Sequence, residues 1–296
     1  MAGRTTVVYK RAGGCKIALN LYRPSGATRL PVVVWIHGGA LIMGSRVGVP
    51  GHLLDLCRDH GFALVSIDYR LAPQVKLPAI VANVRDAFGW LRTDGPAAGL
   101  DPARIVVAGA SAGGYLTLMT GFAVEPIPRA LVAYYGYGDV DGGWYTRPSE
   151  HYRQAVPLYS QEEALSGLRP DVVTSPPNGV QAETRRRYYH YLRQNGLLTR
   201  EVTGFDPARD RAALDPFCPV RNVTAAYPPT MLLHGTADTD VPYERSVEMA
   251  RELARQRVAH HLVTIDGAEH GLVGVDPALV AAAHTRAMAF IGEHLG

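Results

Sequence analysis

The sequence predicts an α/β fold with a mostly parallel, doubly wound sheet and an inserted cap. Apolar runs typical of buried strands alternate with helix patterns along most of the chain. One run, Val32–Ile36, is apolar throughout, as expected of a strand that is covered on both faces. A third observation is a single long region, 138–227, in which the alternation stops.

The elements are expected in a regular order. Two short strands open the chain, and from there strands and helices alternate, which places helices on both faces of the sheet. Strands are expected at 7–10, 17–22, 32–36, 62–68, 104–109, 130–135, 231–234 and 261–265. Helices are expected at 51–60, 80–92, 113–122, 244–255 and 277–295.

The region 138–227 is expected to form the cap. A structureless loop of that length would be implausible in a compact domain, so we expect a cap or lid built of short helices. The sequence therefore divides into a core, residues 1–137 and 228–296, and an inserted segment, residues 138–227.

Composition and charge exclude several classes of protein. The 296 residues are 47% hydrophobic and 19% charged, which is typical of a globular protein, and the net charge of +3 is too small to indicate nucleic-acid binding. Three widely spaced cysteines argue against a disulfide framework or a zinc site. We expect no metal and no cofactor. Since no membrane span or signal peptide is evident, we expect a cytoplasmic protein without membrane insertion.

The strongest local motif is Gly-Ala-Ser-Ala-Gly at 109–113, which has the form GxSxG. It follows an apolar run and precedes a helix pattern, the context of a nucleophile elbow. Glycines two residues to either side let the backbone crowd neighbouring elements while the hydroxyl projects outward. We therefore predict that Ser111 is a nucleophile; the alternative is a glycine-rich turn whose serine caps a helix.

A second motif, His-Gly-Gly-Ala at 37–40, directly follows a strand. Attack on an ester carbonyl creates an oxyanion, and backbone N–H groups must already point at it. We predict donors from Gly38, Gly39 and Ala40, with a further donor from Ala112, the residue after the nucleophile. His37 is interpreted as a structural residue whose ring braces the loop.

A third motif, His-Gly-Thr-Ala-Asp-Thr-Asp-Val-Pro at 234–242, supplies two candidate acids. A carboxylate here can orient a catalytic imidazole and stabilise its cation. The spacing from the glycine and from Val-Pro favours Asp238 over Asp240. For Asp240, a solvated carboxylate in an Asx-type turn fits well.

A fourth motif, Gly-Ala-Glu-His-Gly at 267–271, follows the strand that ends near Ile265. Histidine can take the serine proton and return it to the leaving alcohol near neutral pH. Of eleven histidines, His270 stands out by its loop position and its place in the chain order. His234 is expected to be a hydrogen-bond brace.

The order Ser111, Asp238, His270 is that of α/β-hydrolases, and not of chymotrypsin-like or subtilisin-like enzymes. The chain resembles the α/β-hydrolase superfamily, and within it the hormone-sensitive-lipase-like carboxylesterases. Besides the four motifs, the resemblance rests on Asp-Tyr-Arg-Leu-Ala-Pro at 68–73 and Asp-Pro-Ala-Arg-Ile at 101–105. The family usually has a third glycine where Ala40 stands and an acidic residue where Ala110 stands.

The resemblance implies the α/β-hydrolase fold and a serine carboxylic ester hydrolase that uses no cofactor. Ser111 would attack, His270 would act as base and then as acid, and Asp238 would orient the imidazole; water would then hydrolyse the acyl-enzyme. Small-molecule short-chain or small aryl esters are the expected substrates, because no long apolar lid helix is evident. Asp68 and Arg70 are interpreted as structural.

Other functions remain open at this point. A peptidase of the prolyl-oligopeptidase type, a lactonase or an acyltransferase could use the same triad. A ligand receptor on the hydrolase scaffold is a candidate from another class, although such proteins commonly lose a triad residue.

The inserted segment carries the remaining signals. Nine of the fifteen tyrosines lie between 134 and 191, and they could line a substrate pocket, pack the cap onto the core or form a dimer interface. A homodimer is therefore possible. The Arg185–Arg187 run is interpreted as a solvated helix face and not as a carboxylate clamp.

Overall fold

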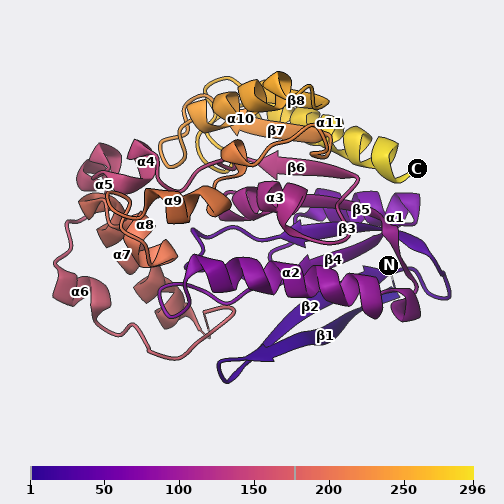
Figure 1. Cartoon of the computed structure of the whole chain (residues 1–296), viewed down its shortest axis with the longest axis horizontal. Helices are drawn as coiled ribbons and strands as arrows, with labels where there is room; N and C mark the ends of the chain where they lie inside the picture. The colour runs from indigo at the N-terminus through magenta and orange to yellow at the C-terminus, as the bar shows by residue number, and fades with distance from the viewer. Residues whose placement is uncertain (1, 177) are drawn as a thin grey trace.

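An eight-stranded sheet with helices on both faces organises the chain (Figure 1). The computed structural model describes residues 2–176 and 178–296. The strands run in the order β1-β2-β4-β3-β5-β6-β7-β8. Pairs β1–β2 and β2–β4 are antiparallel and all the others are parallel. The strands are β1 (Ala2–Ala12), β2 (Cys15–Arg23), β3 (Leu30–Ile36), β4 (Ala63–Ile67), β5 (Leu100–Ala110), β6 (Ala130–Tyr134), β7 (Thr230–Gly235) and β8 (His260–Ile265).

The central strands divide the hydrophobic core into two layers. In β3, Val32, Val34 and Ile36 face one layer, whereas Val33 and Trp35 face the other. This alternation is the two-residue period of a strand, and it is fully apolar because both faces are covered.

The helices cover these two layers. On one face lie α2 (Leu77–Thr93), α3 (Ala112–Ala123) and α10 (Glu244–Arg255), and on the other lie α1 (Gly51–His60) and α11 (Pro277–Leu295). The predicted bounds of α1, α10 and α11 agree with the structure, and η1 (Pro96–Ala98) precedes β5. The predicted fold class, a mostly parallel doubly wound sheet, is confirmed.

Between β6 and β7 the chain leaves the sheet and forms a group of helices at one end of it, on the left of Figure 1. One prediction about this region is wrong, because its helices are not all short: α7 has 17 residues. Asn178 caps the N-terminus of this helix. The elements are α4 (Gly143–Thr146), α5 (Glu150–Ala155), α6 (Gln161–Leu165), α7 (Gly179–Asn195), α8 (Leu198–Thr203), α9 (Arg211–Leu214), η2 (Asp215–Phe217) and η3 (Pro219–Arg221).

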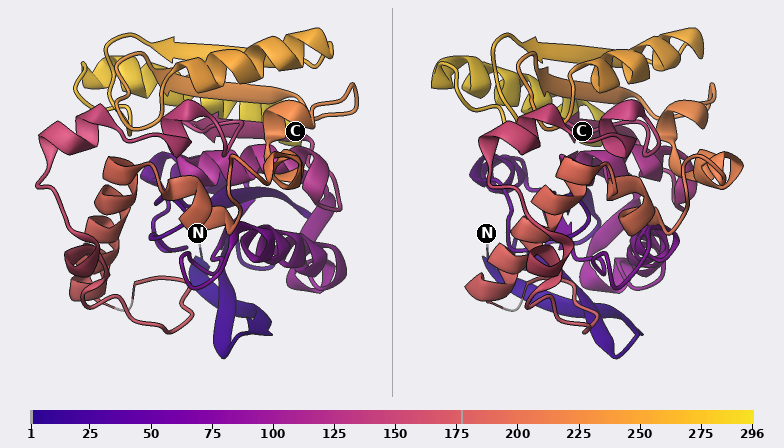
Figure 2. Two further views of the ribbon diagram at one scale, coloured as in Figure 1. Left: turned by 60° about the vertical axis from the view of Figure 1, so that its left-hand side comes forward. Right: turned by 90° about the vertical axis from the view of Figure 1, so that its left-hand side faces the viewer.

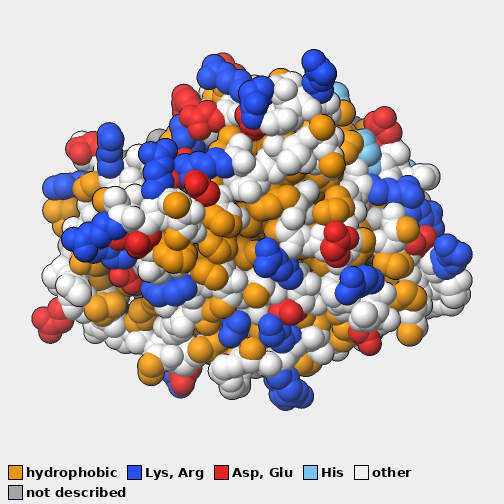
Figure 3. Space-filling model, viewed as in Figure 1, with side chains coloured by type: hydrophobic (Ala, Val, Ile, Leu, Met, Phe, Trp, Pro, Cys, Tyr) orange, Lys and Arg blue, Asp and Glu red, His pale blue; other side chains and the backbone are white. Residues whose placement is uncertain are grey.

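The β1–β2 hairpin extends beyond the rest of the sheet at the lower edge (Figure 2). On the face shown in Figure 3, acidic side chains lie interspersed among the basic ones. Within residues 2–176 and 178–296, no helix is long and apolar enough to cross a membrane.

Candidate active site

Ser111 lies on a strained turn between β5 and α3. Its backbone angles are φ 55° and ψ −122°, a conformation that non-glycine residues rarely adopt. The turn is fixed from outside, since Ser111 N donates a hydrogen bond of 2.9 Å to the carbonyl oxygen of Tyr134 at the end of β6. The sheet therefore stabilises the conformation that exposes the hydroxyl.

The two glycines of the motif are required by close packing. A Cβ added to Gly109 would lie 2.3 Å from the carbonyl oxygen of Gly113. A Cβ added to Gly113 would lie 2.0 Å from the carbonyl oxygen of Ile36, at the end of β3. Both distances are shorter than any real contact, so the GxSxG pattern expresses the packing of the elbow against β3.

The three predicted triad residues meet at the carboxyl ends of the strands. Ser111 Oγ lies 3.0 Å from His270 Nε2, and His270 Nδ1 lies 2.7 Å from Asp238 Oδ2. Because Nδ1 faces a carboxylate, it carries the proton and donates, which leaves Nε2 to accept the serine hydroxyl. This is the geometry that general-base activation of a hydroxyl needs.

The carboxylate of Asp238 is completely buried and is held by several donors. Burial by itself would raise its pKa, but hydrogen bonds from His234 and His270 hold the pKa well below its usual range. The backbone N–H groups of Asp240 and Val241 also donate to its Oδ1, at 2.9 and 2.8 Å. Asp238 is therefore ionised and fixed in one orientation.

His234 contacts Asp238, as expected of the hydrogen-bond brace that the sequence predicts. Its Nδ1 accepts from Ser246 Oγ at 2.7 Å, while its Nε2 faces Asp238 Oδ2 at 3.2 Å and the carbonyl oxygen of Val241 at 2.9 Å. Two acceptors at Nε2 place the proton on that nitrogen.

The predicted oxyanion segment borders Ser111. A Cβ on Gly38 would lie 2.7 Å from the carbonyl oxygen of Ala110, so only glycine lets this backbone approach the elbow. Gly39 and Ala40 have positive φ values of 107° and 55°. Ala112, the predicted donor beside the nucleophile, is the buried first residue of α3.

A network of buried polar groups braces this segment. The ring of His37 stacks on Tyr69 at 4.3 Å between centroids, and the Tyr69 hydroxyl donates to the carbonyl oxygen of His37 at 2.9 Å. Arg46 forms an ion pair with the fully buried Asp68. These contacts fit the structural roles that the sequence predicted for His37 and Asp68.

A cavity of about 650 Å³ opens above Ser111 and His270. Its size is that of a small-molecule binding site. The other lining residues come from the predicted oxyanion segment, the loop before α1, the ends of β3, β5 and β6, the loops after β7 and β8 and helix α7: Trp35, Gly38, Gly39, Ala40, Met43, Gly48, Val49, Pro50, Ala110, Tyr135, Arg186, Tyr189, His190, Asp240 and Gly271.

The prediction for Asp240 is wrong, because its carboxylate is not solvated. Its side chain is only 18% exposed; Oδ1 accepts from Arg193 at 2.8 Å and from the Tyr189 hydroxyl, and Oδ2 lies 3.7 Å from His270 Nε2. The sequence could not reveal this contact, since Arg193 and Tyr189 belong to α7, far away in the chain.

The interpretation of Arg185–Arg187 as a solvated face is also wrong for its first member. Arg185 is 2% exposed and donates to the carbonyl oxygens of Ile42 and Ala72 at 2.7 and 2.8 Å. Arg186 is exposed and pairs with Glu183, as expected.

The tyrosines mostly pack the 138–227 segment against the core. Tyr137, Tyr145 and Tyr188 are at most 3% exposed, whereas Tyr135 and Tyr189 line the cavity. Burial and the charge of Asp238 raise the pKa of Tyr135 to about 12, so its hydroxyl stays neutral.

The sheet order and the meeting of a serine, a histidine and an aspartate at its carboxyl edge are the features of the α/β-hydrolase fold. Family models agree with this fold in two parts of the chain. Residues 19–134 match the BD-FAE model and residues 184–296 match the Peptidase_S9 model, the prolyl oligopeptidase family.

Two solved structures of similar fold cover nearly the whole chain. A protein of unknown function from Staphylococcus aureus has a TM-score of 0.78 at 19% identity, and 99% of each chain is covered. An alpha/beta hydrolase superfamily protein from Enterococcus faecalis has a TM-score of 0.75 at 21% identity, covering 99% of this chain and 100% of that one.

An esterase is among the solved structures of similar fold. Esterase 2 of Thermogutta terrifontis has a TM-score of 0.65 at 22% identity, covering 99% of this chain and 92% of that one. The chain therefore shares the α/β-hydrolase fold with these proteins.

The curated relatives are much longer proteins. A non-reducing polyketide synthase of Aspergillus calidoustus is 28% identical over 316 residues, which covers 90% of this chain and 13% of that protein. One from Aspergillus terreus is 27% identical over 294 residues, covering 84% of this chain and 12% of that protein. The chain spans about an eighth of the length of these relatives.

Proposed function

We propose that the protein is a serine carboxylesterase that hydrolyses short-chain or small aryl esters through an acyl-enzyme. The observation that carries the proposal is the continuous hydrogen-bonded chain from Ser111 through His270 to Asp238, which opens onto a cavity of small-molecule size. Residues 138–227 act as the cap of this cavity, since α7 supplies part of its wall.

Each residue has a defined role in this mechanism. Ser111 Oγ attacks the ester carbonyl while His270 Nε2 takes its proton, and the imidazolium is stabilised by Asp238. Backbone N–H groups of the 38–40 segment and of Ala112 hold the oxyanion. His270 then protonates the leaving alcohol, and a water activated by the same imidazole releases the acid.

The cavity favours small substrates. Trp35, Tyr135 and Tyr189 give it aromatic walls, which suit an aryl or short acyl group. Esterase 2 of Thermogutta terrifontis, which shares the fold, has structures with propionate bound and with paraoxon phosphorylation. A short acyl group and an organophosphorus probe are therefore suitable reagents for this chain.

Substitution of the nucleophile tests the proposal. Ser111→Ala should lower the hydrolysis of p-nitrophenyl acetate and butyrate by at least about a thousandfold, because the attacking group is lost. It should also abolish labelling by a fluorophosphonate while the circular dichroism spectrum stays unchanged. Ser25→Ala, at an exposed turn, is the matched control and should keep both. Activity retained by Ser111→Ala would refute the assignment.

The match of residues 184–296 to the prolyl oligopeptidase family favours a peptidase as the second candidate. It would use the same triad on an amide. Comparing proline-containing dipeptide amides with the p-nitrophenyl esters decides between the two functions, because a peptidase would cleave the amides at comparable rates.

A further inference from the structure

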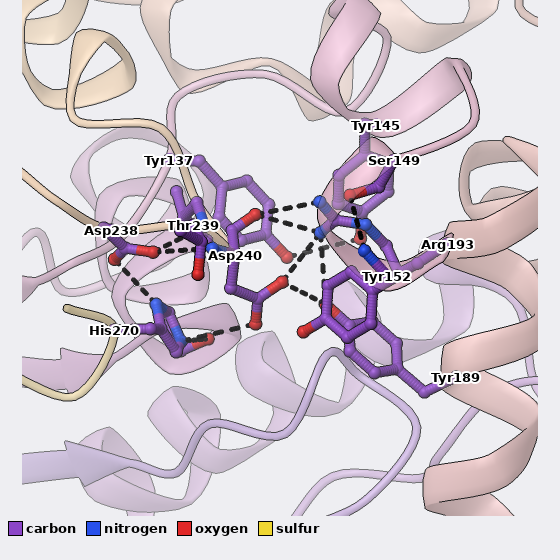
Figure 4. A network of polar contacts seen from close by, with 12 residues as sticks. Tyr137, Tyr145, Ser149, Tyr152, Tyr189, Arg193, Asp238, Thr239, Asp240 and His270 are labelled. Atoms are coloured by element: carbon purple, nitrogen blue, oxygen red, sulfur yellow. Dashed lines mark hydrogen bonds and ion pairs between the residues drawn. The ribbon is translucent and has the colours of Figure 1, made fainter. Parts of the chain in front are cut away.

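Two aspartates lie beside the imidazole of His270, although a catalytic triad requires only one. Asp238 faces His270 Nδ1 at 2.7 Å, and Asp240 Oδ2 lies 3.7 Å from Nε2, the nitrogen that also faces Ser111. Figure 4 shows Asp240 between His270 and the side chains of α7. The two carboxylates thus approach the two nitrogens of the ring.

The charge of Asp240 is balanced from α7. Arg193 is 4% exposed, and its guanidinium donates to Asp240 Oδ1 at 2.8 Å and to the Asp240 carbonyl oxygen at 3.0 Å. Tyr189, one helical turn away, donates its hydroxyl to the same Oδ1 (Figure 4). With Oδ1 held by both donors, Oδ2 is left to face the cavity and the imidazole.

The surroundings of Arg193 allow the charges of the Asp240–Arg193 pair to act on His270. Its guanidinium carbon lies 5.0 to 5.9 Å from the ring centroids of Tyr152, Trp144 and Tyr189, which keep water away from it. Buried charges are screened by salt far less than exposed ones. The net field at His270 therefore depends on both members of the pair.

We propose that Asp240 is a positioning residue for His270 and that Arg193 of α7 balances it, so that this pair sets how readily the imidazole accepts the proton of Ser111. The proposal rests on the catalytic role of His270 proposed above. It makes the 138–227 segment part of the proton-transfer machinery and not only a wall of the cavity.

The two members of the pair act on the imidazole with opposite signs. When Nε2 is protonated during attack by Ser111, its N–H faces a carboxylate at Asp240, which favours the cation. Arg193 disfavours the same cation, because its charge has the same sign. Burial also works against the charged ring, but the hydrogen bond to Asp238 and the charge of Asp240 raise the pKa of His270 above its ordinary value.

The groups that contact His270 or act on its charge come from four elements. The loop after β7 supplies two carboxylates, α7 supplies the guanidinium, the end of β6 supplies a neutral phenol and the elbow supplies the hydroxyl. They are Asp238, Asp240, Arg193, Tyr135 and Ser111.

Two substitutions with opposite expected effects test the proposal. Activity needs neutral His270, so the rate rises with pH as the ring loses its proton. Asp240→Asn removes the negative charge and should move this acid limb of kcat/KM to lower pH by about one unit. Arg193→Gln leaves the negative charge of Asp240 unbalanced and should move the acid limb to higher pH. Arg193→Lys and Asp240→Glu keep the charges and should leave the limb near its wild-type position.

Opposite shifts support the proposal, since a merely structural pair would lower activity in both variants without moving the limb in opposite directions. Shifts of the same sign, or none, would overturn it. If Arg193→Gln does not fold, the comparison of Asp240→Asn with Asp240→Glu decides, because it leaves α7 unchanged. The p-nitrophenyl acetate profile is the activity readout.

An NMR titration of the His270 ring separates this proposal from the proposed function. Opposite shifts of the ring titration in a protein without esterase activity would refute the ester hydrolase and leave the charge balance standing. Esterase activity together with an unshifted His270 titration in both variants would refute the charge balance and leave the ester hydrolase standing.

Discussion

At the scale of single residues, the proposed oxyanion segment depends on backbone conformations that most side chains resist. Gly39 has a φ of 107°, and the two residues after it, Ala40 and Leu41, have φ values of 55° and 63°. The left-handed region costs an ordinary L-residue roughly 1–2 kcal/mol. Leu41 is fully buried, so its side chain has a packing role, whereas the methyl group of Ala40 lines the cavity.

Ala40→Gly should therefore raise the free energy of unfolding by up to about 1 kcal/mol, because the relief of the positive φ outweighs the added flexibility of the unfolded chain. Urea denaturation measures the change. Ala208→Gly, an exposed alanine without a positive φ, is the control and should lower stability slightly. Equal destabilisation by both substitutions would contradict the argument.

The sequence was most informative for residues whose function depends on local structure. Ser111, Asp238 and His270 each follow a strand in a glycine-containing loop, and parallel strands bring such loops to one edge. The structure brings all three together. The sequence does not predict the environment of Asp240, because Arg193 of α7 makes that environment and nothing local to residues 238–242 encodes the contact.

At the scale of elements, α7 is the helix whose role the sequence concealed. Arg185, Tyr189 and Arg193 are spaced by four residues, so they lie along one face of the helix. That face is buried, yet its residues are polar or aromatic. The sequence of α7 therefore lacks the periodic apolar residues that usually reveal a buried helix face. Distant carbonyl groups, at Ile42 and Ala72, satisfy the buried guanidinium of Arg185.

The three consecutive arginines should differ sharply in their contribution to stability. Arg185→Met removes charged donors from two buried carbonyl oxygens and should lower the free energy of unfolding by about 2–4 kcal/mol. Arg186→Met removes only an exposed ion pair with Glu183, so the change should stay within about 0.5 kcal/mol. Urea unfolding of both variants provides the comparison. Similar losses in the free energy of unfolding would show that the buried hydrogen bonds of Arg185 do not stabilise the fold.

At the scale of the whole molecule, the sequence predicted the elements better than their arrangement. The alternation of strands and helices follows from local hydrophobic patterns, and the bounds of α1, α10 and α11 were predicted to the residue. The order of strands in the sheet and the seat of the 138–227 segment depend on long-range contacts. One such contact is the hydrogen bond of 2.9 Å from Leu71 N to the Val173 carbonyl oxygen.

The 138–227 segment should unfold together with the core. A single hydrophobic cluster contains Leu192 and Val202 of this segment as well as Leu71 and Leu77 of the core, and Tyr115 of α3 donates its hydroxyl to the carbonyl oxygen of Phe217 at 2.8 Å. Because these contacts are buried, neither part keeps its apolar surface covered alone, and we expect one cooperative transition.

The three tryptophans allow this expectation to be measured. Trp144 reports on the 138–227 segment and Trp90 reports on α2 of the core. Two variants are needed, each of which keeps one of these two tryptophans and has phenylalanine at the other tryptophan positions. In each variant, the fluorescence transition in urea should coincide with the far-ultraviolet circular dichroism transition. A Trp144 transition at clearly lower urea than the circular dichroism transition of the same variant would mean that the segment detaches first. In that case the Asp240–Arg193 pair would break before the sheet does, and loss of the charge balance at His270 would precede loss of the fold.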